Sequence, residues 1–187
     1  MDLYEVIEHW QNDYCAGSPM PKHFREFASK YFDKIYNMHN DVSDIFECKE
    51  QFIYRAIMPP YEGPLIRFDD LYYSFSSDLL GLKQFAIKDK NVRGDLCIII
   101  AKPFDGLYLN EIGNSLFDDY EGWCRFYEEK EVVSKLSFKT VNSIFYLKDA
   151  KDIENYETIG TKISNKDYRL KFSTIVKKYN LPVEYLK

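Results

Sequence analysis

The sequence predicts one α+β domain of 187 residues in which a β-rich centre lies between helical segments. Apolar residues recur at helical spacing over the first fifty residues, the period becomes strand-like from Gln51, and a helical pattern returns near the carboxyl end. We therefore divide the single domain into a helical layer (1–50), a β-rich core (51–148) and a carboxyl-terminal strand and helix (149–187).

The helices are predicted from stripes of large apolar residues three or four positions apart, which give each helix one buried face. Asp78 is suited to cap the amino end of a helix that follows a strand. The predicted helices are 3–14, 22–38, a short one within 40–50, 79–86 and 166–179.

The strands are predicted from short runs rich in Ile, Val, Tyr and Phe that are bounded by turn residues. The predicted strands are 51–57, 65–68, 71–76, 96–100, 106–109, 131–136 and 138–147, of which the last two could pair as a hairpin. An aromatic and acidic segment, 113–127, is expected to be a long loop, and loops of that length in a compact domain often carry function.

Composition and charge argue against several functional classes. A net charge of −5 argues against broad nucleic-acid binding, which draws on Lys and Arg to neutralise phosphates. The first residues are acidic where a signal peptide needs bases, and the longest apolar run, 96–101, is too short to cross a bilayer. The four cysteines share no metal-ligand spacing. We expect a cytoplasmic protein, of the producing or the host cell, with no metal and no membrane contact.

Glu129 and Glu131 form the first candidate functional pair. In an extended chain, side chains two residues apart point the same way about 6.6 Å apart, so both carboxylates would face one cleft while Lys130 points elsewhere. Two such carboxylates repel, which raises the pKa of one of them. The pair suits proton transfer and the stabilisation of a developing cation, although an exposed strand edge would carry the same pattern.

Arg55 is the second candidate, because arginine is rare in the middle of a buried strand unless its charge is paired. It could form a structural salt bridge, for instance with Glu50 or Asp69. Alternatively, its planar guanidinium could clamp a phosphate with two parallel hydrogen bonds.

A serine-rich strand end, 74–77, is the third candidate. Serines just before a helix commonly act as caps. Their hydroxyls could also hold a ligand and a catalytic glutamate.

The order of an arginine strand, a serine-rich strand end and Glu-x-Glu resembles that of mono-ADP-ribosyltransferases of the Arg–Ser–Glu class, the type of bacterial toxins and phages. The resembling segments are 52–57 (first core strand), 73–78 with 83–86 (serine motif and the helix behind it), and 102–103, 106–109 and 129–133 (closing segment). The likeness spans about 52–146. Two positions depart from the pattern: Asp78 follows Ser77 where Thr or Ser is usual, and Ala56 replaces a frequent Gly.

The resemblance implies two packed, mostly antiparallel sheets with flanking helices, and NAD+ as a substrate in the cleft between them. Glu131 would bind the nicotinamide ribose and stabilise the oxocarbenium-like charge that develops as the bond to nicotinamide breaks. The implied catalytic residues are Glu131, Glu129, Arg55 and Ser76, and the implied NAD+-binding residues are Arg55, Tyr54, Ser74, Ser76 and Ser77.

The resemblance also implies an arginine acceptor on a target protein, expected to be a host-cell protein. In the family, a Glu at the position of Glu129 orients the acceptor and accompanies arginine targets. A guanidinium with a pKa above about 12 attacks only if a carboxylate holds it and takes its proton. Segment 114–127 would recognise the target, with Trp123, Phe126 and Tyr127 as contacts.

Other functions are compatible with the same residues. The site could pass ADP-ribose to water, as an NAD+ glycohydrolase, or to a nucleic acid, although the acidic composition argues against the latter. In a non-catalytic binding or inhibitor protein, Arg55 and Glu131 would be structural. NAD+ turnover separates the enzymes from the binding protein, and label transfer to an added protein separates transferase from hydrolase.

Overall fold

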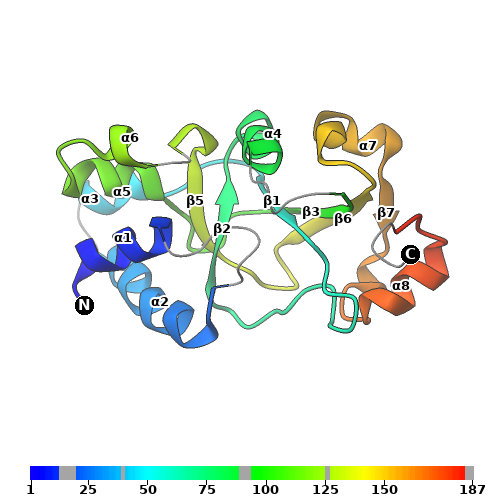
Figure 1. Ribbon diagram of the computed structural model, residues 1–187. Coiled ribbons are helices and arrows are strands. Elements are labelled where there is room, and N and C mark those ends of the chain that lie inside the picture. The colour runs from blue at the N-terminus through cyan, green and yellow to red at the C-terminus, as the bar shows by residue number, and fades with distance from the viewer. Residues whose placement is uncertain (13–19, 39–40, 89–93, 125–126, 184–187) are drawn as a thin grey trace.

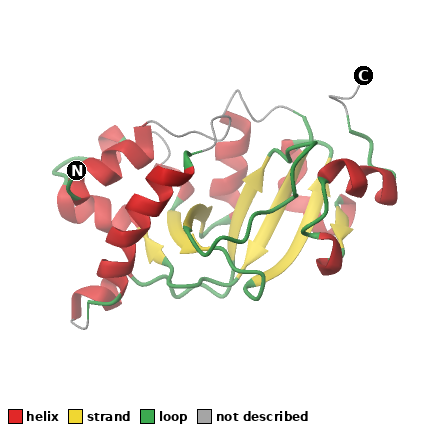
Figure 2. Ribbon diagram, turned by 90° about the horizontal axis from the view of Figure 1, so that it is seen from below, coloured by secondary structure: helices red, strands yellow, loops and turns green. Residues whose placement is uncertain are grey.

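The structure is a computed structural model that describes residues 1–12, 20–38, 41–88, 94–124 and 127–183 (Figure 1). The α-helices are α1 (Leu3–Asn12), α2 (Lys22–Tyr36), α3 (Asp41–Phe46), α4 (Leu79–Lys88), α5 (Leu109–Leu116), α6 (Tyr120–Trp123), α7 (Tyr156–Ile159) and α8 (Phe172–Tyr179). The strands are β1 (Ile53–Ile57), β2 (Tyr72–Ser76), β3 (Leu96–Ala101), β4 (Leu107–Tyr108), β5 (Glu131–Lys135), β6 (Val141–Leu147) and β7 (Thr161–Ile163). Figure 2 shows helices gathered at both ends of the sheet.

These strands form one sheet in the order β4-β5-β2-β1-β3-β6-β7, and each neighbouring pair is antiparallel. The α+β class is therefore confirmed, whereas the two packed sheets are not, because pairing between β1 and β2 joins the halves. That junction is narrow. β1 and β2 are in register only at Tyr54 and Ser76. By contrast, all five residues of β1 pair with β3, and all five residues of β2 pair with β5. Figure 1 shows β2 and β5 running in a different direction from β3 and β6.

The amino-terminal helices cover the β2–β5 end of the sheet. The apolar stripe of α1 is confirmed by the burial of Val6, Ile7 and Trp10, and α2 buries its own stripe beside it. Both helices contribute to the apolar cluster that contains Tyr72 of β2 and Val133 of β5. Tyr14, expected to extend the first stripe, lies outside the described residues.

Three apolar clusters divide the two faces of the sheet. Alternate residues of a strand point to opposite faces, so Phe75 and Tyr72 of β2 belong to different clusters. The α8 cluster, which contains Phe172 and Ile175, occupies one face. The opposite face carries two clusters. The α1–α2 cluster, with Val6 and Phe32, lies at one end, and the α4 cluster, with Leu82, Ile98 and Ile100, lies at the other. The narrow β1–β2 junction lies where these last two clusters meet.

Three sequence-based expectations about local structure are wrong. Segment 113–127 is not a long loop, because α5, α6 and a 3-10 turn, η1 (Tyr127–Glu129), occupy much of it. β5 and β6 do not form a hairpin: β5 pairs with β2 and β4, and β6 with β3 and β7. Residues 65–68 form no strand, although Leu65 and Ile66 are buried, so their apolar run reflects packing rather than sheet pairing.

Three general properties of the described residues bear on the functional class. None of the helices in the described part of the chain is both long and apolar enough to cross a membrane. Cys48, Cys97 and Cys124 are buried thiols, and Cys15 lies outside the described residues. Within the described ranges, no group of three or more His, Cys, Asp or Glu side chains is placed to hold a metal ion.

Candidate active site

The predicted site residues meet at the narrow junction of the sheet. Tyr54 on β1 is in register with Ser76 on β2, and Ser76 is in register with Glu131 at the start of β5. Directly opposite residues of an antiparallel pair project to the same face. The three side chains therefore form a row across three strands, on the face between the α1–α2 cluster and the α4 cluster.

Arg55 follows Tyr54 on β1, so its side chain starts toward the opposite face of the sheet, beside Tyr73, while the charges of Glu129 and Glu131 still act on it. Its Nη1 donates to the main-chain oxygen of Ser74 at 2.5 Å, and its guanidinium lies 5.5 Å from the centre of the Tyr73 ring. The predicted alternative of a salt bridge to Asp69 is wrong, because Asp69 pairs with Arg25 instead. Among the described residues, Arg55 has no ion pair within 4.0 Å, so most of its five N–H donors are uncommitted.

Arg25 and Tyr73 form a second layer beside Arg55. The buried Arg25 lies 3.3 Å from Asp69 Oδ2 and 4.3 Å from the centre of the Tyr73 ring. The Tyr73 hydroxyl donates to Asp69 Oδ1 at 2.8 Å. The guanidinium groups of Arg25 and Arg55 thus lie over the same Tyr73 ring. They orient this ring and concentrate positive charge at the junction.

Hydrogen bonds from Ser76 and Ser77 connect the end of β2 to the segment before β5. The Ser76 hydroxyl donates to the main-chain oxygen of Glu129 at 2.5 Å and accepts from the Asp78 N–H at 3.1 Å. The Ser77 hydroxyl and N–H both donate to the Lys130 oxygen at 3.1 Å. Ser76 is fully buried, so its hydroxyl serves the backbone rather than the Glu131 carboxylate.

Asp78 caps α4 as predicted, because its Oδ1 accepts from the Leu80 N–H at 3.0 Å. The helix it starts lies close to η1. A Cβ added at Gly81 would stand 2.8 Å from the Glu128 oxygen and 3.0 Å from the Glu129 Cα. Only glycine permits this approach, so Gly81 sets where Glu129 sits.

The local geometry of the Glu pair differs from the extended chain that was predicted. Glu129 ends η1, Lys130 has a φ of 51° in the left-handed region, and β5 begins at Glu131. Lys130 is exposed and lies 3.4 Å from Asp78, as expected of a side chain that points away from the site. Both carboxylates are nevertheless buried, with 8% of Glu129 and 6% of Glu131 exposed.

Two side chains of α1 donate hydrogen bonds to the Glu131 carboxylate. Trp10 Nε1 of α1 donates to Oε1 at 2.8 Å, and Gln11 Nε2 donates to Oε2. The Ser74 hydroxyl of β2 also favours the ionised form of Glu131 and lowers its pKa. Ser74 is therefore the serine whose hydroxyl acts on the Glu131 carboxylate, because the Ser76 hydroxyl is bound to the backbone.

Burial and mutual repulsion set the protonation of the two carboxyls. Burial raises the pKa of Glu129 well above its ordinary value, and the charge of Glu131 raises it further while Arg55 opposes the rise. Burial also raises the pKa of Glu131, and the side chains of Ser74, Trp10, Gln11 and Arg55 counteract this. Burial lowers the pKa of Arg55, which nonetheless stays charged, as arginine does in proteins.

The residues expected to recognise a target lie just before the Glu pair. The Trp123 ring packs against Phe117, with centroids 4.9 Å apart, and is partly exposed. The Tyr127 hydroxyl accepts from Asn114 Nδ2 at 3.0 Å, and the Tyr127 main-chain oxygen accepts from the buried Asn110 at 2.8 Å. Phe126 lies outside the described residues.

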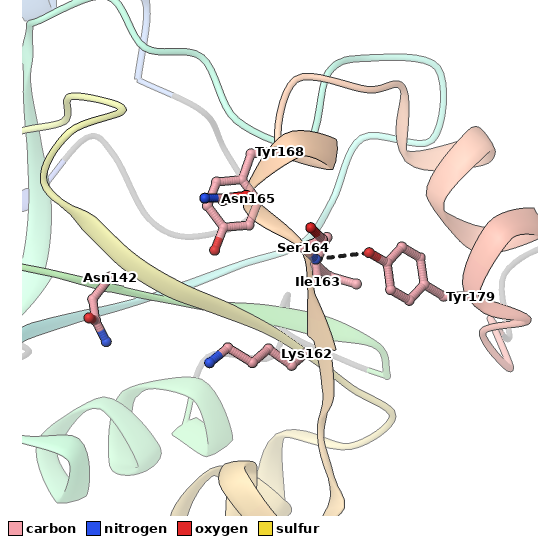
Figure 3. Close-up of a pocket in the computed structure, with 7 residues that line it drawn as sticks. All are labelled: Asn142, Lys162, Ile163, Ser164, Asn165, Tyr168 and Tyr179. Carbon is pink, nitrogen blue, oxygen red and sulfur yellow. Dashed lines mark hydrogen bonds between the residues drawn. The ribbon is translucent and has the colours of Figure 1, made fainter.

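A separate hollow lies at the other end of the sheet, between β6, β7 and α8 (Figure 3). Its volume is about 530 Å³. Lys162 and Asn142 lie on one side of it, and Tyr179 accepts from the Ser164 N–H at 2.8 Å on another. It shares no residue with the row at the β1–β2 junction.

Trp10, Gln11, Arg25 and Gly81 contact the site, yet the sequence did not single them out. In the sequence, Trp10 is one more apolar position of an amphipathic helix and Gln11 is a polar residue next to it, so neither suggests a site. Gly81 was the one available signal, because glycine inside a helix is unfavourable and often indicates a close contact.

No protein-family model and no curated protein matches this chain. The case for a function therefore depends on the geometry of the site.

Proposed function

We propose that this protein is an NAD+-dependent mono-ADP-ribosyltransferase that modifies arginine on a target protein. The observation that supports it most is the proximity of Arg55, Ser74 and Glu131, which come from three strands. Arg55 donates to the main-chain oxygen of Ser74, and both residues favour the ionised form of Glu131. Glu129 lies within electrostatic range of both charged members. A guanidinium, a hydroxyl and two carboxylates around one junction match the needs of NAD+ cleavage.

In this proposal Arg55 binds the NAD+ phosphates. Its uncommitted N–H donors have the planar geometry that suits a pyrophosphate, and the Ser74 oxygen and the Tyr73 ring fix the orientation of the guanidinium. Arg25 next to it adds positive potential.

Glu131 acts on the nicotinamide ribose. As the glycosidic bond breaks, its electron pair leaves with nicotinamide and positive charge spreads over C1′ and the ring oxygen of the ribose. An ionised carboxylate that accepts a hydrogen bond from a ribose hydroxyl stabilises that charge, and more strongly in a buried site than in water.

Glu129 holds and deprotonates the acceptor. A target arginine would bring a positive charge next to Glu129 and lower its raised pKa, so that the carboxylate ionises when the acceptor is bound. A guanidino nitrogen then forms a bond to C1′ and loses a proton to Glu129. With water in place of arginine, the same site would be a hydrolase.

The test is to incubate the purified protein with NAD+ labelled in the adenylate part, together with either a bacterial lysate or arginine methyl ester. The proposal expects release of nicotinamide and labelled product, with mass spectrometry locating ADP-ribose on guanidino groups. Nicotinamide release without label transfer would favour the glycohydrolase. No release under any of these conditions would contradict both enzymes and favour a binding protein.

A further inference from the structure

The amino-terminal helix reaches the carboxylate at the centre of the site. Trp10 and Gln11 are adjacent residues at the end of α1, and their side chains contact different oxygens of Glu131, more than a hundred positions away in the chain. Trp10 is 3% exposed, so its N–H has no access to bulk water as an alternative partner. A buried donor aimed at a buried carboxylate is a specific interaction and not general packing.

Both side chains are held in place by their own neighbours. The Trp10 ring packs edge-on against Phe32, with centroids 5.2 Å apart, and lies 6.5 Å from the Phe24 ring. The Sγ of Cys124, just after α6, donates to Gln11 Oε1 at 3.4 Å, which directs the amide nitrogen toward Glu131. The donors are therefore oriented before any ligand arrives.

The donors leave room for a substrate hydroxyl. An ionised carboxylate offers about four acceptor sites on its two oxygens. Trp10 and Gln11 use two of them, so even with the Ser74 hydroxyl beside the carboxylate about one site is left to accept from a ribose hydroxyl.

We propose that Trp10 and Gln11 are positioning residues that keep the Glu131 carboxylate ionised and oriented for the ribose of NAD+, an inference that rests on the proposed function. They act through Glu131 and need not touch the substrate. The amino-terminal helix is then part of the catalytic apparatus and not only a layer over the sheet.

Other charged or titratable groups also face Glu131, and they bear on any pH measurement. Glu129 of η1 opposes its ionisation and Arg55 of β1 favours it. Tyr120 of α6 is buried nearby, and burial raises the pKa of its hydroxyl, so it stays neutral. The variants below leave these three groups in place.

The test compares Trp10→Phe and Gln11→Met with Phe24→Leu as a matched control. The first two remove one donor each and keep most of the bulk, whereas the control loosens the same cluster without touching a donor. Each donor variant is expected to lower kcat for nicotinamide release roughly tenfold to a hundredfold, with a smaller change in KM. The acidic limb of its pH–rate profile should also move to higher pH.

Phe24→Leu should lower the melting temperature and leave the acidic limb of the pH–rate profile at the same pH as in the parent protein. If the donor variants behave like Phe24→Leu, the two residues are structural and the inference fails. Faster turnover in Trp10→Phe or Gln11→Met would also contradict it, because α1 would then block the site.

A second readout is independent of activity. The chain has two tryptophans, so an indole ¹H–¹⁵N spectrum has two resonances, and Trp123→Phe assigns them. The Trp10 resonance should shift with pH as Glu131 titrates, and this dependence should disappear in Glu131→Gln. A Trp10 resonance insensitive to Glu131→Gln would overturn the inference. If the parent protein releases no nicotinamide while the indole still reports Glu131, the proposed function fails and the contact itself stands.

Discussion

Ser76 lies directly opposite Glu131 across the β2–β5 pair, yet its hydroxyl donates to the main-chain oxygen of Glu129, and it is the Ser74 hydroxyl that lowers the pKa of Glu131. The two serines therefore do different work. Ser76 fixes the turn that carries Glu129, and Ser74 favours the ionised form of Glu131.

Substituting these serines should separate the two roles. Ser74→Ala removes a hydroxyl that favours the ionised carboxylate, so the rate of NAD+ cleavage should fall roughly tenfold and the acidic limb of its pH profile should move to higher pH. Ser76→Ala leaves a buried carbonyl unpaired, so the free energy of unfolding should fall by about 1–3 kcal/mol. Kinetics and chemical denaturation measure both effects. An unchanged stability of Ser76→Ala would contradict the structural role.

Gly81→Ala tests whether α4 positions the Glu pair. Alanine normally stabilises a helix interior by about 1 kcal/mol relative to glycine. Here the added Cβ would stand 2.8 Å from the Glu128 oxygen, so we expect a loss of about 1–3 kcal/mol and a displaced Glu129. Leu80→Ala, at a position half exposed on the same helix, is the control. If thermal unfolding shows Gly81→Ala to be more stable than the parent, the close approach is wrong.

The sequence predicts those parts of the site that depend on local pattern. Arg55, the serine strand end and Glu131 each stand out within their own segment, and the cap at Asp78 follows from neighbouring residues. The contacts of Trp10 and Gln11 with Glu131 depend on how α1 packs on the sheet, and no local pattern encodes that. The pairing of β5 with β2 instead of β6 is likewise non-local, which explains the wrong hairpin.

Arg55→Ala should weaken NAD+ binding about tenfold or more, because the phosphates lose a planar donor group. Isothermal titration calorimetry measures the dissociation constant, and the exposed Arg67→Ala is the control for loss of one positive charge. An unchanged affinity together with lower stability would show that Arg55 is structural.

Stability should depend on pH through the buried carboxyls. The pKa of Glu129 is raised in the folded protein above its unfolded value of about 4.3, so the folded state binds more protons between these two pKa values. The free energy of unfolding should therefore fall as pH rises through this window. Glu129→Gln should flatten the fall and raise the melting temperature near neutral pH. A parent protein whose stability rises across the same range would contradict the assignment.

The central claim is that Glu131 drives cleavage of NAD+ while Glu129 serves the acceptor, and paired measurements of nicotinamide release and label transfer test it most directly. Glu131→Ala should lose both activities by orders of magnitude, and Glu129→Ala should keep release and lose transfer to arginine. Full activity of Glu131→Ala, in a protein shown to be folded, would contradict the account.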